Sequence, residues 1–354
     1  MLAKQSEYLL HCKPKLKRLV EELSPDFDYV SVLATDVNGA SFTASQRQLS
    51  ISDFKDGERG FVVRVYKNGG YCEYSFNDIN TDVNTIREQL ERQTELLDDL
   101  NIEKLETPLL YEEKIVKEFA GEVSEELYHL DNEDIIKRLK SVSDKGVAMD
   151  SMIECRASYS FELYHKMFIS VNRELIQSFG VSFVSAMLLG FKDGETQYNS
   201  VGATGWCGPE IIDEVENKLA EAHEDLMSMF GAPHIEPGEY TVICTPEAAG
   251  LIAHEAFGHG VEMDMFVKER AVAKEHMGEK LASDITNMYD GAQGGIRQTA
   301  SYFFDDEGTL CERTQILKDG YLVSGICDAL SAARLNVAPT GNGRRESFRY
   351  APIP

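Results

Sequence analysis

The chain has 354 residues, of which 43% are hydrophobic and 27% are charged, a composition typical of a soluble protein with enough material for two domains. Its 35 basic and 60 acidic side chains give a formal net charge of −25, so its field repels phosphate backbones and anionic membranes, and direct nucleic-acid binding is not expected. No apolar run approaches the about 20 residues that span a bilayer, and no apolar leader follows Met1, so we expect a cytoplasmic protein.

The seven cysteines are scattered and never stand in C-x-x-C spacing. An odd number without such spacing argues against a disulfide framework and against a closed cysteine-rich zinc module. We therefore expect most of them to be small core residues. They are Cys12, Cys72, Cys155, Cys207, Cys244, Cys311 and Cys327.

The N-terminal part predicts a helix, an antiparallel meander and a second helix. Residues 2–23 carry an apolar stripe at helical spacing, interrupted at Pro14. Asp82 is a helix cap, and the helix that follows should run to about Leu100. Between these helices lie β-type segments, the last two of which flank a Lys-Asn-Gly-Gly turn signal. The predicted strands cover residues 29–34, 40–44, 60–66 and 70–76.

The same order of elements returns after a predicted linker over residues 101–110. A helix is expected over residues 124–142, and a long β region runs from Gly146 to about Ser200. Pro209 then begins an amphipathic helix.

This repetition predicts an N-terminal α+β domain over residues 1–234, with two similar subdomains at 1–105 and 111–230. Residues 235–354 form a second domain, which carries the candidate chemistry. The predicted fold class is therefore α+β, with antiparallel sheets and flanking helices in two domains.

The second domain opens with a short apolar segment, 239–244, that predicts a buried strand. Thr245 is then a helix cap, with Pro246 at the first helical position. Hairpins are predicted over 303–311 and 314–326 around Gly-containing turns. An Asp-Asp-Glu-Gly sequence in the first hairpin raises the alternative of a calcium loop, but the rest of an EF-hand pattern is absent, so we interpret it as a plain turn.

The new helix leads into His254, Glu255 and His259, which form an H-E-x-x-x-H pattern. Imidazole nitrogens are good zinc ligands, and a carboxylate directly after the first histidine can take a proton from the attacking water without being a ligand. The pattern therefore predicts half of a zinc site of the hydrolytic kind.

The spacing of the two histidines requires a distortion of the helix. Five residues of regular helix place His259 about 140° round the axis from His254. Either a π-bulge brings the two side chains together, or the helix ends near Gly258 and His259 leaves it in another direction; Gly258 and Gly260 make both easier. The alternative is a buried helix with two satisfied histidines.

Three blocks of residues resemble the signatures of the TldD/PmbA family of zinc metallopeptidases, also described as modulators of DNA gyrase, and of its TldD branch in particular. They occur in the family's order across residues 235–354. The blocks are His254-Glu-Ala-Phe-Gly-His-Gly-Val-Glu-Met-Asp, Phe304-Asp-Asp-Glu-Gly-Thr and Pro339-Thr-Gly-Asn-Gly-Arg-Arg-Glu-Ser.

This resemblance implies a cytoplasmic zinc metallopeptidase that cleaves unfolded or peptide-like substrates. In that interpretation His254 and His259 bind zinc, and Glu255 moves the proton from water to the leaving amine. The substrate would lie extended along an exposed strand. The family pairs two related subunits, so a homodimer or a heterodimer with a sister subunit is expected, and the intact motif marks this chain as the catalytic type.

The resemblance also implies a third zinc ligand, a cysteine beyond the Gly-Asn-Gly-Arg-Arg-Glu-Ser block. The sequence stops at Pro354, so we expect a C-terminally truncated form in which two histidines bind zinc weakly. Cys311 and Cys327 do not occupy the corresponding position and are interpreted as buried thiols. Should a residue within the chain complete the site, Cys327 and Glu262 are the first candidates.

The same Gly-rich block has two interpretations. Gly341 and Gly343 permit a loop that approaches a ligand closely, and Arg344 or Arg345 is a candidate to bind a substrate carboxylate or to stabilise charge near the zinc. The alternative is an ordinary turn with a structural arginine pair.

Two other functions stay open at this point. The chain is alternatively a peptide-binding or regulatory subunit without turnover, which zinc stoichiometry and peptide cleavage would distinguish from an enzyme. It is alternatively an acidic regulator of a DNA topoisomerase, suggested by the charge of −25 and by the name of the family.

Overall fold

The fold is known from a computed structural model that describes residues 1–53, 57–99, 112–291 and 299–354. Within these ranges the strands form an eight-stranded sheet and a three-stranded sheet. The large sheet has the order β4-β3-β1-β6-β7-β5, with β2 paired to β1 and β8 paired to β7. All of its pairs are antiparallel except β5 with β7. The α+β class predicted from the sequence is confirmed.

The strands of the large sheet are β1 (Tyr29–Ala44), β2 (Leu49–Asp53), β3 (Arg59–Lys67), β4 (Gly70–Phe76), β5 (Ile115–Ala120), β6 (Met152–Ser170), β7 (Arg173–Lys192) and β8 (Glu195–Gly205). Its helices are α1 (Glu7–Leu23), α2 (Val83–Asp99), α3 (Asn132–Val147) and α4 (Ile211–Met229). The C-terminal part contains α5 (Pro246–Ala253), α6 (Met263–Val267), α7 (Ala329–Leu335), β9 (Met288–Gly291), β10 (Arg313–Lys318) and β11 (Tyr321–Leu322).

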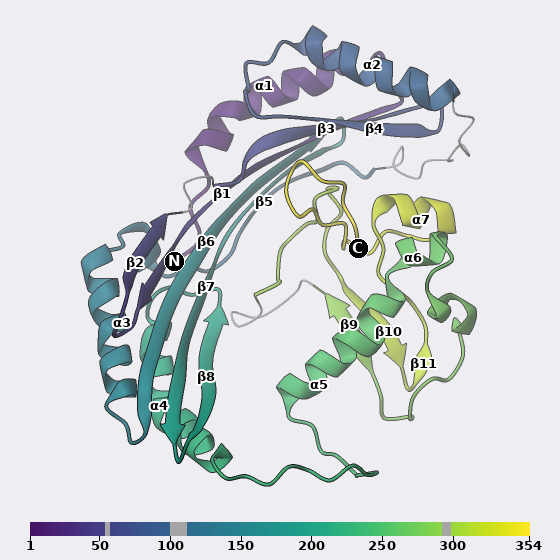
Figure 1. Cartoon of the computed structure of the whole chain (residues 1–354). Helices are drawn as coiled ribbons and strands as arrows, with labels where there is room; N and C mark the ends of the chain where they lie inside the picture. The colour runs from purple at the N-terminus through teal and green to yellow at the C-terminus, as the bar shows by residue number, and fades with distance from the viewer. Residues whose placement is uncertain (54–56, 100–111, 292–298) are drawn as a thin grey trace.

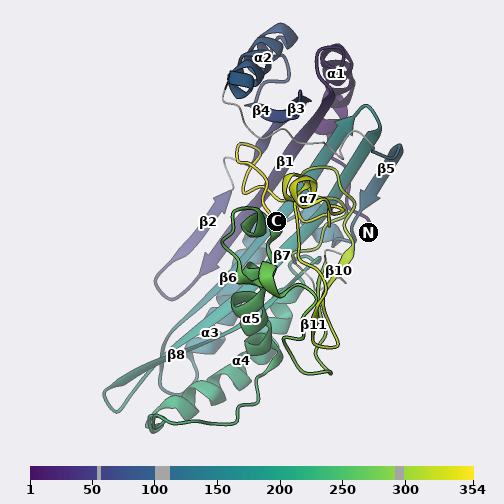
Figure 2. The same ribbon diagram turned by 90° about the vertical axis from the view of Figure 1, so that its right-hand side faces the viewer.

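The large sheet is long and curved, with helices on its convex side and the C-terminal part of the chain on its concave side (Figure 1). α1 and α2 cover one end, where they contact β1 and β4, and α3 and α4 cover the other end against β6 and β8. The turned view in Figure 2 places α5 and α7 in front of the sheet. The motif helix therefore faces the concave surface.

The strand β1 is buried on both faces along its first half. Val32 packs with the helix-covered core, and Leu33 packs on the opposite side with Val62 and Phe168 beneath the C-terminal part. Successive side chains of a strand alternate between faces, so a continuous apolar run needs cover on both. The two segments predicted at 29–34 and 40–44 are one strand, because β6 pairs with β1 without interruption from Ser31 to Ala44.

The first helix differs from its prediction in two ways. It begins after the cap Ser6, because Leu2 forms a β-bridge with Glu122 instead. Pro14 lies inside the helix and does not interrupt it. A proline costs an interior helix about 3 kcal/mol, whereas each buried apolar side chain contributes about 1.5–3 kcal/mol. The buried stripe outweighs the proline; it comprises Leu9, Cys12, Leu16, Leu19, Val20 and Leu23.

The prediction of a buried strand at 239–244 is wrong. The segment forms no strand in the described structure, and Val242 and Ile243 are 72% and 96% exposed. An apolar run becomes a strand only where a neighbouring strand accepts its backbone hydrogen bonds, and the described residues offer none here. Conversely, β5 was not predicted, and the linker predicted at 101–110 lies outside the described residues.

A loop from the C-terminal part fixes its position on the sheet. Phe304 is fully buried against Leu33 and Phe168 of the large sheet. The turn that follows has Gly308 at φ +79°, and a Cβ there would lie 2.3 Å from the Phe168 ring. The Asp-Asp-Glu-Gly sequence is a plain turn, as predicted, in which Asp305 accepts backbone N–H groups from Glu307 and Thr309.

Candidate metal centre

The motif lies on a short helix whose start matches its prediction. The Thr245 hydroxyl accepts the Ala248 N–H, Pro246 occupies the first turn, and α5 then runs to Ala253. A π turn follows over His254–Gly258, and the chain tightens into a 3-10 turn over His259–Val261. Of the two geometries considered from the sequence, the π-bulge is the one that occurs.

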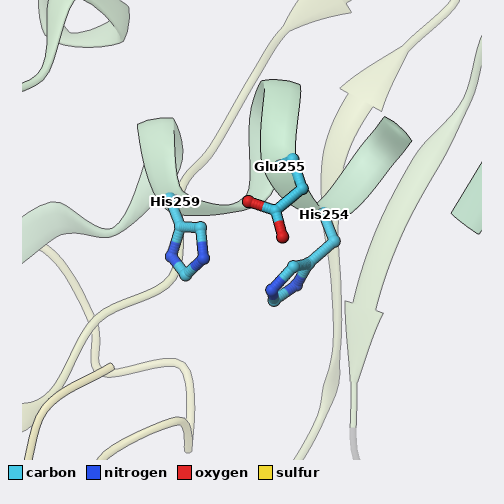
Figure 3. Close-up of side chains that lie close together, drawn as sticks. All are labelled: His254, Glu255 and His259. Carbon is cyan, nitrogen blue, oxygen red and sulfur yellow. The ribbon is translucent and has the colours of Figure 1, made fainter. Parts of the chain in front are cut away.

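The π turn places the side chains of His254 and His259 on the same side of the helix. The His259 N–H donates to the His254 carbonyl, and an i→i+5 hydrogen bond of this kind stacks residues that a regular helix would separate. The imidazole centroids lie 4.6 Å apart. Figure 3 shows both rings on the same side, with the Glu255 carboxylate beside them.

His254, Glu255 and His259 are the one potential metal-binding group found among the described residues. Each offers a ligand atom, and these atoms all lie within 4.8 Å of one another. All three residues are exposed. The geometry excludes the alternative of a buried helix with two satisfied histidines, because both rings are open to solvent.

Glu262 holds the second histidine in place. Its Oε1 lies 2.8 Å from His259 Nδ1, and this hydrogen bond, together with the charge of the carboxylate, raises the pKa of His259. The backbone on either side of Glu262 is fixed, since Val261 accepts from and Met263 donates to Ile326. With Nδ1 bonded to Glu262, His259 has Nε2 available for a ligand.

A cavity of about 460 Å³ lies between the motif and the sheet. His254 and Gly258 line one wall, and Val181 and Phe183 of β7 line another. Arg344 contributes a guanidinium to the same cavity. The wall from β7 was not predicted from the sequence, because nothing in the strand's own pattern indicates which segment packs opposite it.

The two neighbouring arginines occupy different environments. Arg344 stacks on the Tyr302 ring, 4.0 Å from its centroid, and its Nε lies 3.5 Å from an Asp306 carboxylate oxygen. Arg345 instead donates to Glu73 of β4 and to the Tyr350 carbonyl. Only Arg344 lines the cavity.

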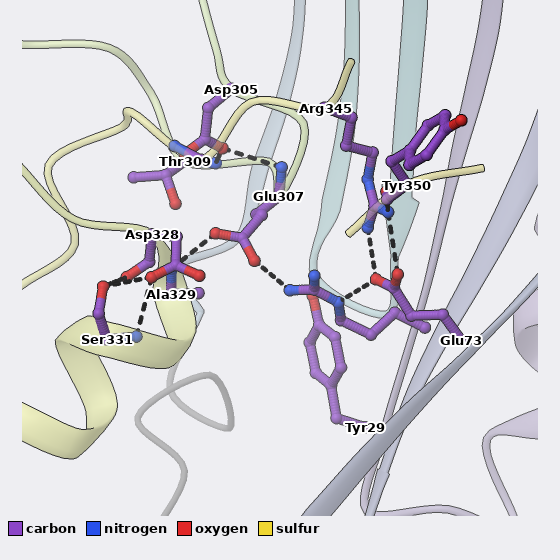
Figure 4. Close-up of polar contacts among 12 residues, drawn as sticks. Tyr29, Glu73, Asp305, Glu307, Thr309, Asp328, Ala329, Ser331, Arg345 and Tyr350 are labelled. Atoms are coloured by element: carbon purple, nitrogen blue, oxygen red, sulfur yellow. Dashed lines mark hydrogen bonds and ion pairs between the residues drawn. The ribbon is translucent and has the colours of Figure 1, made fainter. Parts of the chain in front are cut away.

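Arg345 belongs to a buried ionic network that joins the C-terminal part of the chain to the large sheet (Figure 4). Glu307 pairs with Arg64 of β3 and accepts the Ala329 N–H through its other oxygen. Arg64 and Arg345 together lower the pKa of Glu73, against the opposing effect of burial. Glu73 and Glu307 thus each pair with an arginine, and such a partner of opposite sign is the condition for burying a charged side chain.

Gly341 and Gly343 allow the loop to pack closely against other parts of the chain. Gly341 has φ +75°, and a Cβ there would lie 2.7 Å from the Leu310 carbonyl oxygen; a Cβ on Gly343 would lie 2.3 Å from Glu307. These contacts are with protein atoms, so the close approach that the glycines permit is to the chain itself.

The two cysteines considered as substitute ligands lie outside the candidate metal group. Cys311 and Cys327 are buried, with Sγ atoms 3.3 Å and 3.4 Å from the carbonyls of Gly341 and Ala338, and burial raises both pKa values. Six of the seven cysteines are buried, as predicted, and Cys244 is exposed.

Fold and site together define an α+β protein with a candidate metal centre of two histidines and a glutamate on the concave side of its large sheet. Residues 237–354 match the profile of the PmbA/TldA metallopeptidase C-terminal domain. A metalloprotease of Methanocaldococcus jannaschii is 31% identical over 159 residues, 44% of this chain and 35% of that one. A metalloprotease of Archaeoglobus fulgidus is 29% identical over 297 residues, 82% of this chain and 64% of that one.

Solved structures share the fold at low identity. A Thermotoga maritima protein described as a modulator of DNA gyrase superposes with a TM-score of 0.78 at 17% identity, over 95% of this chain and 76% of that one. TldE from Thermococcus kodakarensis gives a TM-score of 0.71 at 16% identity, over 96% and 75% of the two chains.

The resemblance to the TldD/PmbA family is confirmed, since residues 237–354 match its C-terminal domain model and TldD homologs are among the similar proteins. The alignments span between 24% and 64% of the length of relatives such as a Buchnera aphidicola TldD homolog and the Archaeoglobus protein. None of the helices in the described ranges is long and apolar enough to cross a membrane.

Proposed function

We propose that the chain is the zinc-binding subunit of a metallopeptidase that hydrolyses unfolded or peptide-like substrates. The observation that carries the proposal is the π turn, which gathers His254, Glu255 and His259 so that their ligand atoms lie within 4.8 Å of one another. The naming of a Saccharolobus solfataricus relative, 25% identical over 193 residues, as a zinc metalloprotease TldD homolog supports the choice of metal.

The two histidines suit zinc, because imidazole nitrogens are among the ligands that this ion prefers. His254 and His259 would hold the ion, and Glu262 fixes the orientation of His259 through its 2.8 Å contact. Bound zinc would supply Lewis-acid polarisation of the scissile carbonyl.

Glu255 is the candidate general base and acid of the reaction. Its carboxylate lies within 4.8 Å of the histidine nitrogens, so it can take the proton of the attacking water and deliver it to the leaving amine. Arg344 is the candidate for binding a substrate carboxylate, since its guanidinium lines the same cavity as His254.

The proposal includes the division of the chain at residue 234 and a dimer, either of two copies or with a sister subunit related to TldE. The structural likeness to TldE supports a related partner. Binding without turnover, and regulation of a DNA topoisomerase, are the competing functions; no feature of the site favours either over hydrolysis.

Glu255→Gln tests the proposed role directly. We expect peptide hydrolysis to fall at least about a hundredfold while the zinc content stays unchanged, because the residue moves a proton and is not a ligand. Activity is measured on a quenched fluorescent peptide library, and zinc by elemental analysis. Glu247→Gln, in the first turn of the same helix, is the matched control and should retain activity. Zinc loss in Glu255→Gln would contradict the assignment, as would unchanged hydrolysis.

A further inference from the structure

One face of the lower half of the large sheet exposes apolar side chains beside the candidate metal centre. Phe183, Met187 and Phe191 of β7 are 41%, 37% and 51% exposed, and Tyr198 of β8 is 67% exposed. We call these four residues the β7 track. Figure 1 shows this part of β7 and β8 facing the open side of the sheet toward α5, away from α3 and α4.

The track continues a face that is buried farther along the strand. Phe179 and Val181 pack under Tyr302 at the C-terminal part, and Phe183 lines the cavity that contains His254. Because alternate residues of a strand share a face, Met187 and Phe191 extend the same row beyond the cavity. Val184, Ala186 and Leu188 point the other way into the helix-covered core.

Along β7 and β8 themselves the face carries no charge, whereas on the neighbouring strand β6 the exposed Arg156 lies opposite Met187. Residues 179–191 and 196–206 contain no Asp, Glu, Lys or Arg, in a chain of which 27% is charged. The side chains between the apolar ones are hydroxyls, including Ser185, which hydrogen-bonds Ser158 of β6 at 2.8 Å. Exposed apolar rows of this kind usually mark interaction sites, since a solvated face would be polar.

We propose that the β7 track binds an extended segment of the peptide substrate, running along β7 with apolar side chains at alternate positions. This inference rests on the proposed function, because the track reaches the metal motif through the cavity that Phe183 and His254 both line. The interval from Phe183 to Phe191 corresponds to about 27 Å of strand, which an extended peptide of about eight residues would match. Side chains on one face of such a peptide repeat about every 7 Å, so every second one would meet a β7 residue of the track, since Phe183, Met187 and Phe191 lie four residues apart.

The test measures binding rather than cleavage, on the full chain after metal removal with a chelator. The probes are two fluorescein-labelled peptides of equal composition, Leu-Ser repeated four times and a scrambled version with paired leucines, followed by fluorescence anisotropy. We expect the alternating peptide to bind at least about fivefold more tightly. The variants Phe183→Ser and Met187→Ser should each weaken it about tenfold, the loss expected for one apolar contact. Val116→Ser on β5, where the side chain is 67% exposed, is the matched control and should bind as the parent does.

Equal binding of the two peptides, or equal affinity of the track variants and the Val116 control, would overturn the inference. The inference would also be overturned if Phe183→Ser and Met187→Ser converted a dimer to a monomer in sedimentation velocity without loss of peptide binding. The track would then be a contact between two copies of the chain. Because no step requires hydrolysis, an inactive protein that binds the alternating peptide through the track supports this inference while it contradicts the proposed function.

Discussion

The contact between Glu262 and His259 gives a sharp test of how the metal centre is built. The carboxylate Oε1 lies 2.8 Å from Nδ1, and the side chains of His259 and Glu262 are 56% and 21% exposed. Loss of such an outer partner typically lowers metal affinity 10- to 100-fold. Because His259 is more than half exposed and water can replace the carboxylate, we expect Glu262→Ala to weaken zinc binding about tenfold, at the lower end of that range.

The assay is a zinc titration against a competing chromophoric chelator, with unfolding by urea as a check on folding. Glu262→Gln keeps an acceptor oxygen and should recover most of the affinity. Glu279 pairs with His276 in the same i,i+3 arrangement, at 2.7 Å, outside the candidate metal group, so Glu279→Ala is the matched control and should bind zinc as the parent does. An unchanged affinity in Glu262→Ala would refute the positioning role, and a loss of a thousandfold or more would identify Glu262 as a ligand.

Two further predictions concern the turn and the pH dependence. Gly258 has φ −53°, and a Cβ there would meet its neighbours at 3.6 Å and 3.8 Å, which is ordinary contact. We therefore expect Gly258→Ala to keep zinc affinity within about twofold and to raise the unfolding free energy by up to about 1 kcal/mol. A tenfold loss of zinc affinity would show instead that the π turn needs glycine. Burial lowers the pKa of His165, so its contribution to stability is present above the unfolded value of about 6.5 and is lost as the pH falls below it. Urea unfolding at pH 7.5 and 5.5 should show a smaller acid loss for His165→Gln than for the parent, and equal losses would contradict this.

Local chemistry was predictable where it rests on short-range rules. The Thr245 cap, the proline after it and the hairpin around Asp319 each depend on a few adjacent residues, and the structure confirms them. The sequence also limited the motif to two geometries. It could not choose between them, because glycine on both sides of His259 is compatible with either.

The rest depends on contacts between segments far apart in the chain. Arg64 and Glu307 pair across a sequence separation of 243 residues, and no pattern in either segment indicates the other. The same limit applies to Arg344 and Arg345, which are adjacent and chemically identical. Only the packing of the loop places one in the cavity and ties the other to Glu73.

The two halves of the candidate site come from different parts of the chain, and this has a physical consequence. The histidines lie on the C-terminal part, whereas Phe183 belongs to β7, so their separation is set by how the loop around Phe304 docks on the sheet. That docking is held by a fully buried aromatic side chain and by the Glu307 pair with Arg64. Interfaces of this composition resist gradual deformation, because separating them exposes apolar area and leaves buried charges without partners. The distance between the candidate metal ligands and the proposed peptide-binding face is therefore set by Phe304, Glu307 and Arg64, which belong to neither group.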